Sequence, residues 1–297
     1  MRRKLVKQGQ NALTLTLPAN WIKAKKLKAG DDVELEEKNQ NIIVYRVGEA
    51  ELSIKNITVQ TNHRHQLRSI IASAYKAGFD EILLNFKTRP PLQEINKICN
   101  SFTGLEIISQ DTNKITLKSF LKTEEKELEN LIVKMLQSAK LIAETVHQRW
   151  GDVNLKNLRL SLLNLRKLRD HCLRTIHKCD FGGDKSYDYY DFVTQLEKVS
   201  NSFCHLAEYS VTNKPKRSDL VSKLILDLEK FYKIYLKKDF SLANKLWLEH
   251  RNEVKEAVNI QNLSKLLKEE DPEMVVYFYN INMQFRHLAS RLVSLNS

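Results

Sequence analysis

The sequence predicts a multi-domain α+β protein, because the spacing of its apolar residues changes along the chain. Residues 1–47 and 49–121 contain short runs in which apolar and polar side chains alternate, which is the period of strands. From residue 122 onward the apolar positions fall three and four residues apart, which is the period of amphipathic helices. The chain has 8 glycines and 5 prolines in 297 residues, and so few breakers favour long helices.

The first segment, residues 1–47, is predicted to hold four short strands and one short helix. Leucine and threonine alternate over residues 12–17, which indicates a half-buried strand, and another short strand precedes it. Pro18 ends the strand and suits the first turn of a helix, and residues 33–36 and 42–47 form two further strands. Elements this few and short cannot bury a core alone. We therefore expect a second copy of the segment to complete it.

This segment also carries much of the positive charge of the chain. Its first thirty residues include eight cations and no acid, and the whole chain has a net charge of +12. Basic side chains gain free energy by releasing counterions from nucleic-acid phosphates, and an anionic lipid surface would satisfy the same charge. The eight cations are Arg2, Arg3, Lys4, Lys7, Lys23, Lys25, Lys26 and Lys28.

The same segment resembles the AbrB/SpoVT swapped-hairpin DNA-binding domain. The likeness is carried by Leu17-Pro18 at the end of a strand and by Leu27-Lys28-Ala29-Gly30-Asp31 before the next one. The resemblance implies that two chains interlock through residues 1–47 into one small barrel, of which each chain supplies half. It also implies that the eight cations bind double-stranded DNA. The alternative is that they form a solvated basic face.

The segment departs from the pattern of that family at two places. Gln10 and Asn11 stand where the family often has an arginine after the turn glycine. Ile22 and Lys23 stand where it often pairs two arginines on the helix. We therefore expect contacts with phosphates, rather than base-specific readout, to dominate any binding to DNA.

Residues 49–121 are predicted to form a small α/β connector domain with helices on one face of a sheet. Apolar residues at Leu67, Ile71 and Ala74 give the first helix one apolar face, and Pro90-Pro91 opens the second. Gly104 is placed where the second helix would end. The predicted strands cover residues 53–59, 81–86, 105–109 and 114–120.

The remaining residues, 122–297, are predicted to form two three-helix bundles, residues 122–213 and 214–297. Thr123 and Ser218 are expected to cap the first helix of each set. The third helix of each set contains the triplet His-Leu-Ala, at His205 and again at His287, which indicates an internal repeat.

These helices resemble the PhoU family of phosphate-signalling regulators. The likeness is carried by Leu196-Glu197-Lys198-Val199-Ser200-Asn201 with the following His205-Leu206-Ala207-Glu208, and by Asp239-Phe240-Ser241-Leu242-Ala243. The run from Arg68 to Gly78 is similar to a segment of archaeal proteins that join an AbrB-like head to PhoU repeats. The resemblance implies a regulator of phosphate uptake whose helical part senses an effector or binds a phosphate-transport or signalling protein.

The metal motif of that family is eroded here. PhoU proteins hold metal clusters through Glu-x-x-x-Asp, which places two carboxylates on one helical face. The first repeat keeps Glu197 but has the neutral Asn201, and the second has Tyr279 and Met283 at the aligned positions. We therefore expect no metal site and no cofactor, and little iron, zinc or manganese in the purified protein.

One predicted helix, which begins after Asp152, carries two further candidate sites. His171-Cys172 and His177-x-Cys179 offer zinc-ligand chemistry, but Cys172 falls on the apolar stripe, so a packed thiol is the preferred interpretation. The helix also has a second basic stretch, which either binds nucleic acid or an acidic partner or is a solvated face. That stretch comprises Lys156, Arg159, Arg166, Lys167, Arg169, Arg174 and Lys178.

These patterns predict a dimeric, cytoplasmic DNA-binding regulator and not an enzyme. Four scattered cysteines suit a reducing compartment, and no apolar run approaches the length of a membrane span. The alternative is an adaptor that docks on phosphate-transport or signalling proteins and uses residues 1–47 only to dimerise. A metal phosphatase is a third hypothesis, which the missing carboxylate pairs disfavour.

Overall fold

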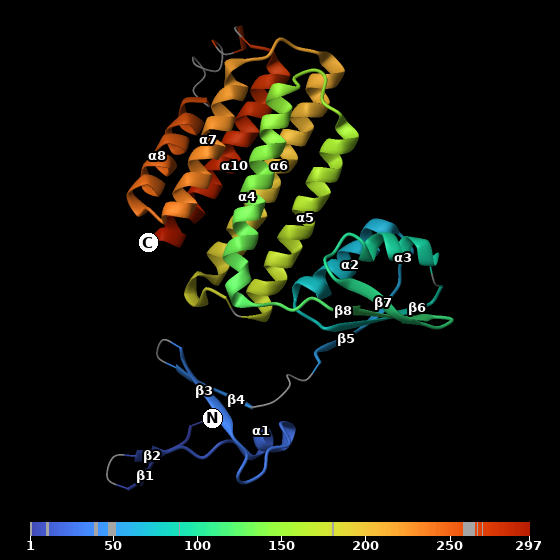
Figure 1. Ribbon diagram of the computed structural model, residues 1–297, viewed down its shortest axis with the longest axis vertical. Coiled ribbons are helices and arrows are strands. Elements are labelled where there is room, and N and C mark those ends of the chain that lie inside the picture. Colours follow the sequence, from blue (N-terminus) through green and yellow to red (C-terminus); the bar gives the residue numbers. More distant parts are fainter. Residues whose placement is uncertain are drawn as a thin grey trace. The chain divides into compact units, whose positions relative to one another are not determined.

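The computed structural model describes residues 2–9, 12–38, 41–46, 52–88, 90–179, 181–257, 265, 267–268 and 270–297. The chain divides into two compact units, Met1–Glu51 and Leu52–Ser297, which we call the head and the body. Both are drawn in Figure 1. No helix in the described ranges is long and apolar enough to cross a bilayer.

The head consists of two separate two-stranded antiparallel sheets and one short helix. Its elements are β1 (Val6–Gln8), β2 (Ala12–Thr14), α1 (Ala19–Ala24), β3 (Val33–Lys38) and β4 (Asn41–Arg46). β1 pairs with β2 and β3 pairs with β4. The predicted strand over residues 12–17 is too long, because β1 offers partners only as far as Val6, which faces Thr14. Residues 39, 40 and 47 of the predicted hairpin lie outside the described residues.

The apolar side chains of the head are not covered within one chain. None of its residues whose exposure is described is buried, and Leu13, Leu35 and Ile42 are 62%, 64% and 66% exposed. A two-stranded sheet is marginally stable in water without an apolar surface to pack against. The head therefore has strands of the kind predicted but no apolar core among its described residues.

The first part of the body is a four-stranded sheet with two helices. Its elements are β5 (Ile54–Val59), α2 (Arg64–Lys76), β6 (Glu81–Phe86), α3 (Leu92–Cys99), β7 (Leu105–Gln110) and β8 (Lys114–Ser119). The strand order is β5-β6-β8-β7, with β5 and β6 parallel and the other neighbours antiparallel. Figure 1 shows α2 and α3 on the same side of this sheet. Ile71 and Tyr75 of α2, Ile82 and Leu84 of β6 and Ile95 of α3 share one buried core.

The second part of the body consists of long helices. They are α4 (Glu125–Gln148), α5 (Leu155–Lys178), α6 (Ser186–Asn213), α7 (Asp219–Lys237), α8 (Phe240–Ala257) and α10 (Pro272–Asn296). One buried apolar cluster runs through all of them, from Leu128 of α4 to Leu292 of α10. Phe192 of α6 stacks on Tyr235 of α7 with ring centroids 5.4 Å apart. The two predicted three-helix sets therefore share a core, and their division at residue 213 stays a prediction.

One of the three predicted caps is confirmed and two are wrong. The Ser218 hydroxyl accepts a hydrogen bond from the backbone amide of Leu220, at 3.1 Å. The N-cap of α4 is Glu124 instead of Thr123, since the helix begins one residue later than expected. Gly104 does not end α3, whose C-cap is Asn100. It occupies the turn before β7 with a φ of +65°, where a Cβ would lie 3.2 Å from the backbone nitrogen of Leu121.

A buried arginine joins the two parts of the body. Arg174 of α5 is fully buried and donates hydrogen bonds to the carbonyl oxygens of Tyr75 at 2.8 Å and Phe79 at 2.9 Å. Its guanidinium also lies 3.4 Å from a carboxylate oxygen of Asp80. The close approach depends on Gly78, because a Cβ there would lie 3.2 Å from the Cβ of Lys178. The sheet part is thereby attached to α5 through two backbone carbonyl groups, of which that of Tyr75 also accepts from the amide of Gly78 at 3.1 Å.

Candidate nucleic-acid interface

The eight predicted DNA-binding cations of the head are available for an external partner. Seven of them are exposed and Lys25 is half-buried. The structure shows no ion pair between any of the eight and a described carboxylate. Their charge is therefore not neutralised by the described part of the chain.

Four of these cations gather at the end of α1. Lys23 lies in the last turn, Lys25 is the C-cap, and Lys26 follows with a left-handed φ of 54°. The backbone amide of Leu27 then donates to the carbonyl of Ile22 at 3.0 Å, which closes the turn and leads to Lys28. The carboxyl end of a helix carries partial negative charge, so this end tolerates a group of cations.

The other four cations lie before or in β1, and the acids of the head lie elsewhere in sequence. Arg2, Arg3 and Lys4 precede β1, and Lys7 pairs with Leu13 of β2 in the strand register. The acids among the described residues of the head occur between Asp31 and Glu37, around the start of β3 and within it. A polyanion is attracted to cations and repelled by carboxylates, so the eight cations are the candidates for its contacts. Gln10 and Asn11 lie outside the described residues, so their part in base readout stays a prediction.

The second basic stretch, on α5, is largely used inside the body. Arg159 pairs with Glu208 at 2.9 Å, and Lys178 pairs with Asp80. Arg174 is buried against the sheet part, as described above. Arg174 therefore cannot contact an external partner, whereas the nucleic-acid, acidic-partner and solvated-face interpretations of the exposed members of the stretch stay predictions.

The eroded metal motif on α6 is occupied by arginines. One carboxylate oxygen of Glu197 accepts a hydrogen bond from Arg166 at 2.7 Å. The other forms an ion pair with Arg169 at 3.0 Å. Arg166 also donates to the side-chain oxygen of Asn201 at 2.8 Å. Guanidinium groups thus supply positive charge at Glu197 and Asn201, the two positions that the sequence analysis compared with a metal motif.

The histidines and cysteines of α5 do not form a ligand set among the described residues. Cys172 is fully buried, with its sulfur 3.8 Å from that of Met135, and burial raises the pKa of its thiol. Burial, with the nearby positive charges of Arg174 and Lys134, lowers the pKa of His171 to about 4. The prediction that Cys172 is a packed thiol is confirmed.

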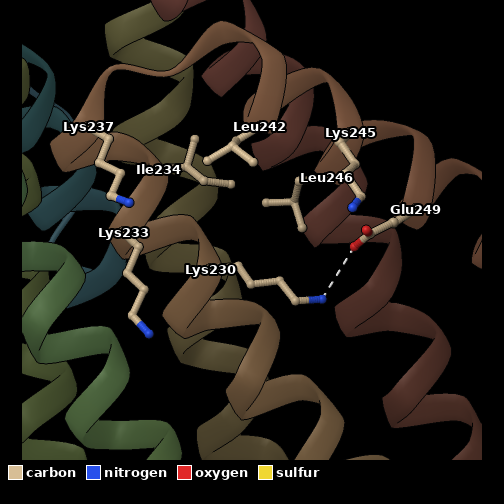
Figure 2. Close-up of a pocket in the computed structure, with 8 residues that line it drawn as sticks. All are labelled: Lys230, Lys233, Ile234, Lys237, Leu242, Lys245, Leu246 and Glu249. Carbon is tan, nitrogen blue, oxygen red and sulfur yellow. Dashed lines mark hydrogen bonds and ion pairs between the residues drawn. The ribbon is translucent and has the colours of Figure 1, made fainter.

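A cavity of about 260 Å³ lies between α7 and α8 and was not anticipated from the sequence. Figure 2 shows four lysines around it, and three apolar side chains also line it. Its lining residues are Lys230, Lys233, Ile234, Lys237, Leu242, Lys245, Leu246 and Glu249. Lys230 contacts Glu249 at 3.3 Å, the interaction drawn in the figure, and also Asp227 at 2.9 Å.

The sequence interpretation also missed a buried polar cluster next to Lys230. Asp227 of α7 and His250 and Glu253 of α8 lie close together in the body. A signal for it is present in the sequence, because Asp227 and His250 interrupt the apolar stripes of their helices. On α8, for example, His250 follows Ala243 and Leu246 on the buried face.

Comparison with known proteins identifies the head alone. Residues 6–51 match the family described as antidote-toxin recognition MazE, bacterial antitoxin. No curated protein and no solved structure matches the chain. The likeness of the helices to PhoU proteins therefore remains a prediction from short motifs. What is supported is that the chain has an N-terminal segment similar to MazE/AbrB-like domains of the antitoxin type.

Proposed function

We propose that this protein is a dimeric DNA-binding regulator, with a binding role and not an enzymatic one. Two heads together bind double-stranded DNA, and the body binds an effector or a partner protein. The observation that carries the proposal is the set of eight head cations that lack a described carboxylate partner, within a segment similar to MazE/AbrB-like domains. Domains of the MazE and AbrB kind bind DNA and dimerise.

The exposed strands of the head support the dimer. Leu13 and Leu35 lie on two sheets that share no strand pairing among the described residues, and each is more than half exposed. Burying one such side chain contributes about 1.5–3 kcal/mol. A second copy that covers both sheets would supply the missing core and would bring sixteen cations together, twice the eight of one head.

The composition of the basic set favours phosphate contacts. It contains six lysines and two arginines, and lysine acts as a compact point charge without the planar fork that reads bases. If half of the dimer's cations reach the backbone, binding neutralises about 6–8 phosphates, and log affinity should fall against log salt with a slope of about −5 to −7.

The test is duplex binding by the full-length protein across a salt series. Wild type, Arg3→Ala and Lys23→Ala are compared with Lys114→Ala, which removes an exposed lysine of the body. Each head substitution should flatten the slope by about two units, one for each copy in the dimer. Lys114→Ala should leave the slope unchanged. Negligible affinity at low salt, or equal slopes for all four proteins, would reject the proposal and leave the head as a dimerisation element of an adaptor.

We further propose phosphate uptake as the regulated process, on the strength of the PhoU-like motifs around Glu197 and Asp239. Chromatin immunoprecipitation with sequencing, at high and at low phosphate, tests this directly. Occupancy at a few promoters of phosphate-transport genes that changes with phosphate supports it. Scattered occupancy that ignores phosphate contradicts it and indicates an architectural role.

A second candidate function is antitoxin-type recognition of a toxin protein. It is favoured by the description of the family that matches residues 6–51. An antitoxin would form a stable complex with a toxic partner and would rescue growth when the two are expressed together. The Lys23→Ala variant separates the two functions, because a loss of DNA affinity should leave neutralisation of a toxin intact.

A further inference from the structure

Three side chains of kinds that can bind a metal ion converge in the body. Asp227 projects from α7, and His250 and Glu253 project from successive turns of α8. One ligand atom from each lies within 4.8 Å of the other two. Asp227 and His250 are 2% and 1% exposed, whereas Glu253 is half-buried. The three side chains therefore face one another at a site that is largely shielded from solvent.

The atoms that meet there lack partners. Four buried side-chain atoms have no hydrogen bond among the described residues: one carboxylate oxygen each of Asp227 and Glu253, and both ring nitrogens of His250. Nδ1 of His250 lies 3.5 Å from Oε2 of Glu253, which is too long for a good hydrogen bond. Buried polar atoms are normally satisfied, so this group of orphans points to a missing ligand.

The surroundings hold these side chains in place. The outer oxygen of Asp227 accepts from Lys230 at 2.9 Å, and the outer oxygen of Glu253 lies 2.8 Å from Nζ of Lys223. The ring of His250 stacks on Phe231, with centroids 5.6 Å apart and planes 10° apart, and it lies 5.3 Å from the ring of Phe285. Partners of this kind orient metal ligands in proteins, because each carboxylate keeps its inner oxygen for the ion.

The two lysines that contact the outer carboxylate oxygens lie at the protein surface. Lys223 and Lys230 are about half exposed, so water screens their positive charges. The inner carboxylate oxygens of Asp227 and Glu253 are buried, so their charges are screened less.

We propose that Asp227, His250 and Glu253 bind one divalent transition-metal ion of the zinc class. One imidazole nitrogen and two carboxylate oxygens are ligands that Zn²⁺ takes readily, whereas Ca²⁺ and Mg²⁺ prefer oxygen alone. Three protein ligands leave a fourth position for water or an anion. This site is distinct from the eroded motif at Glu197, and it departs from the expectation that the protein carries no metal.

Such an ion would connect α7 and α8 directly beside the lysine-lined cavity of Figure 2. Lys230 belongs to both places, because it lines the cavity and contacts Asp227. The inference is independent of the proposed DNA binding, which concerns the head alone.

The test is zinc binding by the full-length protein. The protein is stripped with a chelator, loaded with Zn²⁺ alone, freed of excess metal and assayed by elemental analysis and calorimetry. Asp227→Asn, His250→Gln and Glu253→Gln are compared with wild type. Two matched controls are Glu249→Gln, which removes the acid next to His250, and His205→Gln. His205 belongs to an exposed His-x-x-Glu pair on α6, at the same 3.5 Å from Glu208.

We expect one zinc ion per chain in wild type. Each of the three site variants should bind zinc at least tenfold more weakly, because removing even a group that only hydrogen-bonds to a metal ligand typically costs about tenfold or more in affinity. Both controls should bind as wild type does, and zinc should raise the melting temperature of wild type and of the controls alone. If a site variant fails to fold, the effect of zinc on the melting temperature of wild type still tests the proposal. Two results would overturn the proposal: no zinc retained by wild type, or zinc retained equally by all three site variants.

Discussion

The head and the body differ in how far their apolar side chains are buried. In the body, Ile82, Phe192 and Phe285 are fully buried in cores made by the chain itself. In the head, Leu13, Leu35 and Ile42 remain more than 60% exposed, and no residue there whose exposure is described is buried. A unit with its own core can fold as a monomer, whereas a unit without one depends on another surface. The contrast agrees with the proposal that two chains associate through the head.

The two regions also treat charge differently. Arg166, Arg169 and Arg174 of the body are committed to its own carboxylates and carbonyl groups. The eight cations of the head have no described carboxylate partner. Basic residues that are paired inside a chain hold its parts together, and those left unpaired can recognise a partner. A count of basic residues along the sequence does not make this distinction.

The largest expected effect tests the missing core of the head. Leu35→Asp should weaken the dimer by about 10²–10⁴-fold, because each of two copies loses a burial worth about 1.5–3 kcal/mol. Sedimentation across a range of concentrations measures this. Leu141→Asp, which changes a leucine of α4 that is 60% exposed, is the control and should leave association unchanged. A dimer as tight as wild type would mean that Leu35 is not covered by the second copy.

The next prediction concerns the buried charge of the body. Arg174→Ala should lower the free energy of unfolding by about 2–5 kcal/mol, since it empties the space of a fully buried side chain and removes the donor to the carbonyl oxygen of Phe79, although Asp80 keeps its pair with Lys178. Arg159→Ala removes an exposed arginine from its pair with Glu208 and should cost at most about 1 kcal/mol. Urea unfolding of both variants gives the comparison. Similar losses would show that Arg174 does not hold the sheet part to α5.

A smaller effect is expected from pH. The pKa of His171 is lowered to about 4 in the folded body, against an ordinary value of 6.5. Between these values the unfolded chain binds a proton that the folded chain does not. The histidine therefore supports folding above pH 6.5 and withdraws that support as pH falls to 4, by at most about 3 kcal/mol. His171→Gln should flatten this part of the stability profile, and His205→Gln, at an exposed histidine, should not.

The smallest effect concerns helix ends. Ser218→Ala should destabilise the body by about 1 kcal/mol, because it removes the hydroxyl that caps α7. Ser138→Ala is a suitable control, since that hydroxyl only donates to the carbonyl of Lys134 within a helix. Thermal unfolding resolves the difference if the two variants are measured together. Equal melting temperatures would show that the cap at Ser218 is dispensable.

Local patterns in the sequence were enough to predict most elements. The predicted strand over residues 81–86 coincides with β6, and Ser218 caps α7 as expected. These features depend on the spacing of apolar residues and on one hydrogen bond between near neighbours. The errors at Thr123 and Gly104 are also local. The N-cap of α4 is Glu124, one residue after Thr123, and the C-cap of α3 is Asn100, four residues before Gly104.

The candidate sites divide in the same way. The eight cations of the head could be found from sequence, since they all fall in the first thirty residues, which contain no acid. The pairing of Arg174 with residues near Asp80 could not, because 94 positions separate these two residues in the chain. The meeting of Asp227 with His250 was missed for the same reason, although each residue interrupts an apolar stripe.

Residue order thus sufficed for the kinds of elements, the separation of charge in the head and the shortage of apolar residues able to close a core there. The folded body decided which charges are used up and which polar atoms meet. The physical reason is that helix and strand periods are set by neighbours along the chain, whereas ion pairs and buried ligands form between side chains that only packing brings together. Arg166 and Glu197, on different helices, show this most directly.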